Sequence, residues 1–235
     1  MKRFTGHIVV LLVFLAGCTT EARRLRMHAT LDSINALNRS SQPFNVQDVE
    51  PLVTFFDRHG TPDERLMAHY LLGRALHEHG EAPAALQCYH DAIDCVDTTD
   101  CDFAQLSRVY GQMGGIFSLQ GLYHQEITYY RRSEEYAWKG KDTLAALMYY
   151  EQLGNAYKNI GILDSTICIM EKVAKQYAQY EYASESAIAL GSIIRTLVKK
   201  KNMPRQNLIW KYMNQNQACL ILRAILLKGV STITV

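Results

Sequence analysis

The chain has 235 residues, of which 48% are hydrophobic and 20% are charged, and its formal net charge is +2. This composition is that of a globular protein and excludes a disordered chain. The nearly neutral charge gives no electrostatic case for nucleic-acid binding, and the length allows one or two domains.

The start of the chain, positions 1–17, has the layout of a secretory signal. Lys2 and Arg3 form a charged start, residues 8–15 form an apolar run, and Leu15-Ala16-Gly17-Cys18 follows. The run is too short to span a bilayer as a mature helix. The sequence LAGC resembles the lipobox of bacterial lipoproteins. That resemblance implies cleavage before Cys18 and acylation of Cys18, whose lipid chains would hold the protein on a membrane at about 0.8 kcal/mol per buried methylene.

The residue after the lipobox cysteine indicates the membrane. In bacterial lipoproteins an Asp at this position retains the protein in the inner membrane, whereas this chain has Thr19. The resemblance therefore implies the bacterial cell envelope, with a lipid anchor in the outer membrane facing the periplasm. An ordinary secretory signal that ends in a similar small-residue site is the alternative.

Residues 18–60 are expected to form two helices. The first is predicted for residues 23–38, before a break that contains Pro43. The second is predicted for residues 46–58, with Asn45 as N-cap and Gly60 as stop. The pair is either a degenerate repeat or the capping unit that keeps a repeat array soluble.

The clearest helix hairpin lies at residues 61–95. Thr61 and Glu64 form a capping box, and Pro62 suits the first helical position. Gly80 ends the first helix, because glycine adopts the left-handed conformation there without steric cost. A second helix with an apolar face follows at the same helical period.

Small residues inside this hairpin predict close packing of its two helices. Gly73 in the middle of a helix costs about 1 kcal/mol relative to alanine, so we expect it and Ala85 to let the two backbones approach, with Tyr89 filling the adjacent gap. The pattern resembles the tetratricopeptide repeat (TPR) at Leu72, Gly73, Leu76, Gly80, Ala85, Tyr89 and Ala92. The resemblance implies an all-α fold, an α-solenoid of stacked antiparallel helix hairpins.

The glycine pair occurs three times with the same seven-residue spacing, at positions 73 and 80, 114 and 121, and 154 and 161. The steps between the first glycines are 41 residues (73 to 114) and 40 residues (114 to 154), against a family period of about 34. We place the additional residues in loops at 97–102 and 139–142 or in longer second helices. The repeats are assigned to residues 61–97, 103–138 and 143–177.

A fourth, incomplete repeat is assigned to residues 182–198. In this assignment Gly191 matches Gly154, and the turn glycine is replaced by Val198. The tail at residues 199–235 begins with a lysine run and has a different composition. Since lysine codons are rich in adenine, where a reading frame slips most easily, we interpret this tail as the product of a frameshift in a longer protein. A natural divergent tail is the alternative.

The sequence shows no catalytic motif and no zinc-type spacing. His77 and His79 are two residues apart on a helix, so they point about 200° apart and cannot share a metal ion. Cys95 and Cys101 flank a predicted loop, and the oxidising envelope allows a disulfide between them; two free thiols are the alternative. We therefore expect no enzyme activity, no cofactor and no metal.

The TPR resemblance also implies a binding surface. In TPR arrays the first helices of successive repeats line a concave groove that binds an extended or helical peptide. The groove positions carried over to this chain are Tyr70, Arg74, His77, Arg108, Ser118, Glu151, Asn155 and Lys158. We expect the three Arg and Lys residues in this set, together with Asn155, to hold a carboxylate or polar backbone by charge-assisted hydrogen bonds. An ordinary solvated helix face is the alternative.

The function implied by these resemblances is that of a non-catalytic scaffold in the bacterial cell envelope that binds a protein or peptide partner. The sequence also resembles the sensor portion of envelope TPR proteins that continue into a membrane helix, a coiled coil and a cytoplasmic DNA-binding domain. The alternative is therefore a truncated sensor portion of a membrane-associated transcriptional regulator. A gene that continues into an apolar span of about 20 residues favours the regulator.

Overall fold

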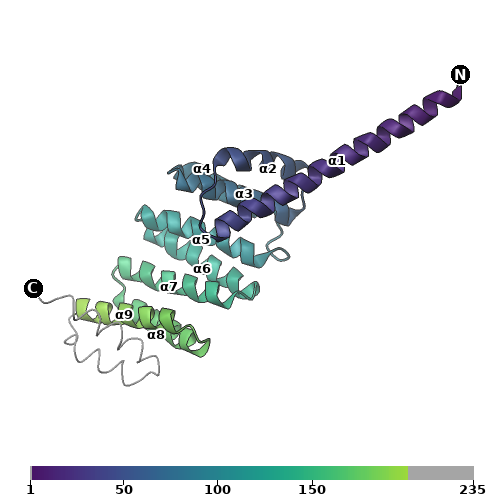
Figure 1. Cartoon of the computed structure of the whole chain (residues 1–235). Coiled ribbons are helices and arrows are strands. Elements are labelled where there is room, and N and C mark those ends of the chain that lie inside the picture. Colours follow the sequence, from purple (N-terminus) through teal and green to yellow (C-terminus); the bar gives the residue numbers. More distant parts are fainter. Residues whose placement is uncertain (1, 201–235) are drawn as a thin grey trace, which may run out of the picture. The chain divides into compact units, whose positions relative to one another are not determined.

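In a computed structural model, the chain is described from residue 2 to residue 200 for the backbone and from residue 21 to residue 200 for the side chains. The described part consists of helices joined by short connections (Figure 1). They are α1 (Lys2–Arg39), α2 (Val46–His59), α3 (Pro62–Glu78), α4 (Ala82–Asp94), α5 (Phe103–Leu119), α6 (Tyr123–Lys139), α7 (Thr143–Asn159), α8 (Leu163–Gln179) and α9 (Ala183–Lys199). This confirms the predicted all-α fold of antiparallel helix hairpins. The frameshift hypothesis concerns the tail at residues 199–235. Residues 201–235 of this tail lie outside the described part.

The chain divides into two compact units. The N-terminal unit comprises residues 1–101 and contains α1 to α4. The C-terminal unit comprises residues 102–235, and its described part contains α5 to α9. In each unit, helices that follow one another in the chain pack together.

In the N-terminal unit the predicted caps of α2 and α3 are present. At α3, the Thr61 hydroxyl accepts the Glu64 backbone N–H at 3.3 Å, and the Glu64 carboxylate accepts the Thr61 N–H at 2.7 Å. Asn45 and Asp48 form the corresponding capping box at α2. These two boxes satisfy N–H groups that have no partner inside the helix, which explains why both helices begin where the sequence predicts.

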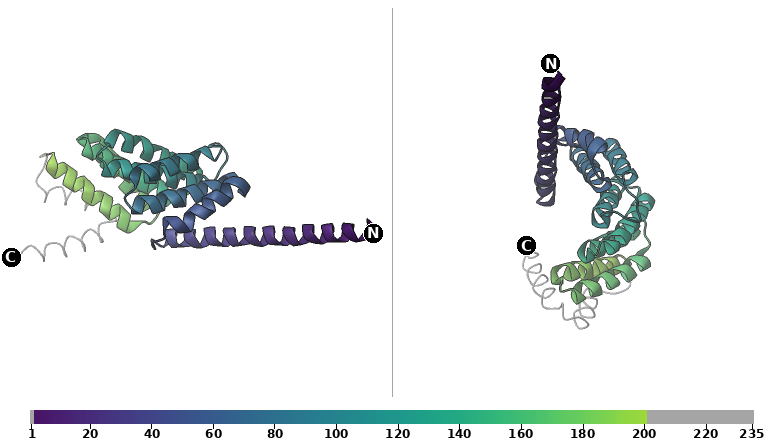
Figure 2. Two further views of the ribbon diagram at one scale, coloured as in Figure 1. Left: turned by 90° about the horizontal axis from the view of Figure 1, so that it is seen from above. Right: turned by 90° about the vertical axis from the view of Figure 1, so that its right-hand side faces the viewer.

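The first helix differs from its prediction. We expected it at residues 23–38, whereas α1 runs as one helix over Lys2–Arg39 and includes the LAGC sequence. Its N-terminal end extends beyond α2 and α3 (Figure 2). Within the described residues, no helix combines the length and the hydrophobicity that a membrane crossing requires.

The helices of the C-terminal unit begin at regular intervals, at positions 103, 123, 143, 163 and 183, and they stack in chain order (Figure 2). Each helix from α5 to α9 has 17 residues, and a tight turn separates it from the next. Each turn contains a residue in the left-handed region, with φ between 57° and 82°, at Gly121, Lys141, Gly161 and Glu181. The following N–H bonds back to the carbonyl five positions earlier, as from Leu122 to Phe117 at 2.9 Å, which is the Schellman pattern.

This regular interval explains the long repeat period and corrects one expectation. Two such helices with their two turns account for the whole step from Gly114 to Gly154, so the additional residues lengthen both helices of a hairpin. Residues 139–142 form only a tight turn and not a longer loop. The predicted loop near 97–102 is present, because residues 95–102 separate α4 from α5.

The predicted register of the fourth repeat is wrong by three positions. Gly73, Gly114 and Gly154 occupy the same place in their helices, counted from the first residue, and in α9 that place holds Ile194, not Gly191. Positions three apart lie on the same face of a helix, so the periodicity could not separate the two registers. The helix also continues past Val198, the predicted turn position, to Lys199.

The small-residue positions do allow the close approach that the sequence predicts. A Cβ atom on Gly73 would lie 2.5 Å from Cε1 of Tyr89, which is impossible without a shift of the ring. The same contact recurs between Gly114 and Tyr130 at 2.8 Å and between Gly154 and Met170 at 2.9 Å. Glycine and partner are equally far apart along the chain in all three hairpins, so the second helix packs directly on the glycine each time.

Candidate functional site

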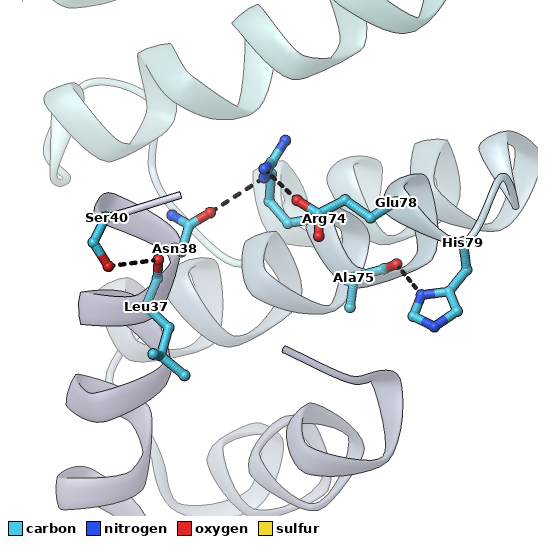
Figure 3. A network of polar contacts seen from close by, with 7 residues as sticks. All are labelled: Leu37, Asn38, Ser40, Arg74, Ala75, Glu78 and His79. Carbon is cyan, nitrogen blue, oxygen red and sulfur yellow. Dashed lines mark hydrogen bonds and ion pairs between the residues drawn. The ribbon is translucent and has the colours of Figure 1, made fainter. Parts of the chain in front are cut away.

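In the N-terminal unit, the predicted groove residue Arg74 of α3 contacts Asn38 and Glu78 of the same unit (Figure 3). The Arg74 guanidinium donates to the Asn38 side-chain oxygen at 3.2 Å and to the Glu78 carboxylate at 2.6 Å. Asn38 belongs to α1, so the end of α1 lies against α3 at this position. Tyr70 is only 3% exposed, and its ring packs near that of Tyr89 with centroids 6.2 Å apart.

His77 is the third predicted groove residue of α3. Burial lowers the pKa of its imidazole, and the nearby Arg74 guanidinium lowers it further. The ring is therefore neutral at physiological pH, and it offers a hydrogen-bond donor and an acceptor but no charge. The charged groups on this face of α3 are Arg74, which Asn38 and Glu78 hold in place, and Glu78 itself.

In the C-terminal unit, Ser118 at the end of α5 supports a buried carboxyl group. Ser118 lies near Glu126, which is 1% exposed at the start of α6, and its hydroxyl acts to lower the pKa of that carboxyl group. The Oε2 atom of Glu126 has no hydrogen-bond partner among the described residues. Burial raises the pKa of Glu126, so Ser118 acts here on the stability of the hairpin.

The predicted groove residues on α7 form a polar row. Lys158 donates to the Asn155 side-chain oxygen at 2.9 Å, and Glu151 accepts the Tyr177 hydroxyl of α8 at 3.2 Å. Burial raises the pKa of Glu151. The three groove residues of the row are partly buried, so the row is accessible and also held in place by its own contacts.

A cluster of cations extends this row from α7 to α9. Burial lowers the pKa of Lys158, and repulsion by Arg195 and Lys199 of α9 lowers it further, while Glu151 opposes the shift. Arg195 and Lys199 are exposed. We call Lys158, Arg195 and Lys199 the basic cluster. Arg195 and Lys199 both act electrostatically on Lys158, and neighbouring positive charges attract an anion.

The structure divides the predicted groove set. Arg74 lies in the N-terminal unit, whereas Arg108 and Lys158 lie in the C-terminal unit, on α5 and α7. Arg108 is partly buried. The cations that we predicted to bind one ligand together therefore belong to two different units. The cations that lie together within one unit are those of the basic cluster.

Arg195 and Lys199 were not predicted as groove residues. Counted from the first residue of its helix, Arg195 has the same place in α9 that Arg74 has in α3 and Asn155 has in α7. The step from Gly114 to Gly154, applied to Asn155, reaches it directly. The predicted alignment of Gly191 with Gly154 was shifted by three positions, so it did not pair Arg195 with Asn155. The spacing of the glycines in the sequence would have given the correct pairing.

The predicted disulfide between Cys95 and Cys101 is not formed. Neither sulfur is bonded to another cysteine, and both side chains are partly buried. Among the other cysteines at residues 21–200, Cys88 is buried and Cys168 is exposed. Cys95 is the C-cap of α4, and its sulfur lies within 4.8 Å of side-chain ligand atoms of Asp57 and His69. Its side chain thus points towards α2 and α3.

Comparison with solved structures places this fold among TPR-like repeat proteins. The crystal structure of Podosopora anserina putative kinesin light chain nearly identical TPR-like repeats matches with a TM-score of 0.63 at 14% identity, over 89% of this chain and 98% of that chain. BtubC (BKLC) from P. vanneervenii matches with a TM-score of 0.56 at 10% identity, over 81% of this chain and 74% of that chain. No protein-family model and no curated protein matches the chain. At these identities the likeness establishes a TPR-like fold.

Proposed function

We propose that this chain is a non-catalytic scaffold of the bacterial cell envelope that binds an acidic segment of a protein or peptide partner. The TPR-like fold supports a role in protein interaction, because such hairpins present long rows of side chains from successive helices. The basic cluster is the observation that carries the choice of an acidic partner.

The electrostatics of the basic cluster favour a carboxylate ligand. Lys158 is partly buried and repelled by Arg195 and Lys199, so its charged form is disfavoured in the free chain. A carboxylate bound between them would offset this repulsion and accept charge-assisted hydrogen bonds. Asn155 already orients the Lys158 amine, which lowers the entropic cost of binding.

The partner site is tested by charge reversal on the two helices. Lys158→Glu/Arg195→Glu reverses the cluster, and Lys172→Glu/Lys175→Glu makes the same change at two exposed positions of α8. Captures from envelope extracts with the purified chain are expected to lose their partner with the first variant and keep it with the second. Identical partner lists for the two variants would contradict the site.

The proposed membrane attachment depends on Cys18. It is supported by the LAGC sequence after a charged and apolar segment, and Thr19 supports the outer membrane, with the protein facing the periplasm. Cys18→Ser is expected to abolish incorporation of a labelled fatty acid and to release the chain from the membrane fraction. Unchanged labelling and fractionation would refute the lipid anchor and leave the scaffold proposal standing.

A further inference from the structure

Three potential metal ligands of different kinds converge in the N-terminal unit. Asp57 comes from α2, His69 from α3, and Cys95 is the C-cap of α4. One ligand atom of each lies within 4.8 Å of the others, and Nε2 of His69 is 2.9 Å from Oδ1 of Asp57. The three residues are far apart in the sequence, so their spacing gave no sign of a site.

We propose that Asp57, His69 and Cys95 bind a divalent metal ion of the zinc type. Carboxylate oxygen, imidazole nitrogen and thiolate sulfur are the donors that zinc uses. A tetrahedral ion with bonds of about 2.1 Å separates its donor atoms by about 3.4 Å, a value between the shortest observed separation and the 4.8 Å limit. Three protein ligands leave a fourth position for water or for a side chain of a partner.

The His69 imidazole is an incompletely satisfied group in this cluster. Its side chain is 12% exposed. Nε2 contacts Asp57, whereas the buried Nδ1 has no hydrogen-bond partner among residues 21–200. Nε2 is the nitrogen that faces Asp57, so a metal ion in the cluster would bind Nε2 in place of that hydrogen bond, and Nδ1 would keep the ring proton.

The charges around the sulfur favour a cation. The charged groups that act on the Cys95 sulfur are the Arg65 guanidinium and the carboxylates of Asp57, Asp91 and Asp94. Three negative charges and one positive charge thus act on the sulfur, so the electrostatic environment favours a bound cation. Metal binding replaces the S–H bond of Cys95 by a sulfur–metal bond and releases the proton to water. Binding is accordingly expected to weaken as the pH falls.

Access and anchoring are both compatible with this site. The Asp57 side chain is 46% exposed, so an ion reaches the cluster from solvent. Bound metal would connect the ends of α2 and α4 to the middle of α3. It would also compete with the disulfide predicted between Cys95 and Cys101, because both need the same sulfur atom.

Cobalt titration of the full chain tests the site. The chain is purified without a polyhistidine tag, stripped of metal, kept reduced and titrated with Co²⁺, whose bond to a thiolate gives a near-ultraviolet charge-transfer band. One equivalent of Co²⁺ is expected to saturate the band, and Zn²⁺ is expected to remove it. Cys95→Ser should abolish the band, and His69→Gln should weaken binding at least tenfold.

Matched variants separate the site from nonspecific binding. Cys101→Ser changes the nearby thiol, and His90→Gln changes an exposed histidine of α4; both are expected to bind Co²⁺ as the unmodified chain does. No band, or a band unaffected by Cys95→Ser, would overturn the proposal.

Thermal unfolding provides the second readout. One equivalent of Zn²⁺ is expected to raise the melting temperature of the unmodified chain and of Cys101→Ser, but not that of Cys95→Ser. Unfolding in chelator shows whether each variant is folded. If His69→Gln is not folded, Asp57→Asn replaces it, because that side chain is largely exposed. A zinc effect equal in Cys95→Ser and the unmodified chain would also overturn the proposal.

Discussion

Glu126 is a buried carboxyl group at a position where the equivalent residue of the first hairpin is Ala85. It is 1% exposed, one of its oxygens lacks a partner within the described residues, and burial raises its pKa. A raised pKa in the folded chain means that the native state binds the proton more tightly than the unfolded state. The stability contributed by this group is therefore greatest below the unfolded-state pKa and is lost as the pH rises through the folded-state pKa.

We predict that Glu126→Gln stabilises the chain at pH 7.5 by about 1 kcal/mol, because glutamine fills the same space without the charge that burial disfavours. The gain should diminish towards pH 4.5, where the native carboxyl is protonated. Calorimetric melting temperatures across this range measure the effect.

The control for this prediction is Glu135→Gln on the same helix. Glu135 is 57% exposed and forms an ion pair with Lys139 at 2.7 Å, so its loss should lower stability slightly instead of raising it. Equal stabilisation by both substitutions would show that burial of Glu126 is not the cause.

At the scale of the element, the helix hairpin depends on two glycines with different roles. Gly73 admits the Tyr89 ring, which would lie 2.5 Å from a Cβ atom. Gly80 has φ +82° and open space around its Cβ position, so only its backbone conformation favours glycine. The two roles make different predictions for the same substitution.

We predict that Gly73→Ala destabilises the N-terminal unit by about 1–3 kcal/mol through overpacking, although alanine favours a helix by about 1 kcal/mol. Combined with Tyr89→Leu, it should cost less than the sum of the two single changes, because the smaller side chain removes the clash. Urea unfolding of the four forms gives this coupling energy.

Gly80→Ala is the comparison for the same cycle. It should cost about 1 kcal/mol from the left-handed backbone alone, and its effect should add to that of Tyr89→Leu. A coupling with Tyr89 as large as that of Gly73 would disprove the distinction between the two glycines.

At the scale of the whole molecule, the chain consists of two compact units joined through residues 95–102. This connection is the longest between any two consecutive described helices. It contains Asp97 and Asp100, both exposed, and a turn in which Asp97 accepts the Thr99 N–H at 2.9 Å. The connections between the helices α5 to α9 are shorter, tight turns closed by backbone hydrogen bonds.

We predict that a protease specific for aspartate cuts the folded chain first at residues 97–100 and releases two fragments that resist further cleavage. Long connections with exposed polar residues are cut before short turns. Asp142, whose N–H bonds to the Ala137 carbonyl at 3.0 Å, serves as the internal comparison. Mass spectrometry of early time points measures the order, and a first cut at Asp142 would contradict the division.

The sequence predicted the helix hairpins because caps, turn glycines and small residues act locally. Thr61 and Glu64 form hydrogen bonds with backbone N–H groups close by in the chain, and Gly80 adopts the left-handed conformation of the turn. Gly73 leaves space for Tyr89, which follows in the next helix of the same hairpin. The regular interval of the C-terminal unit was only partly predicted, because Lys141 and Glu181 adopt left-handed turns without the glycine that marks the others.

The sites were decided by tertiary structure. Periodicity does not distinguish positions three apart on a helix, so the sequence alignment missed Arg195 although the step from Gly114 to Gly154 leads to it, and the tertiary structure showed its electrostatic interaction with Lys158. The meeting of Asp57, His69 and Cys95 required three helices to converge. The sequence by itself determined the repeats, because their forces act between near neighbours; the tertiary structure determined which distant side chains meet, because those contacts depend on how the helices pack.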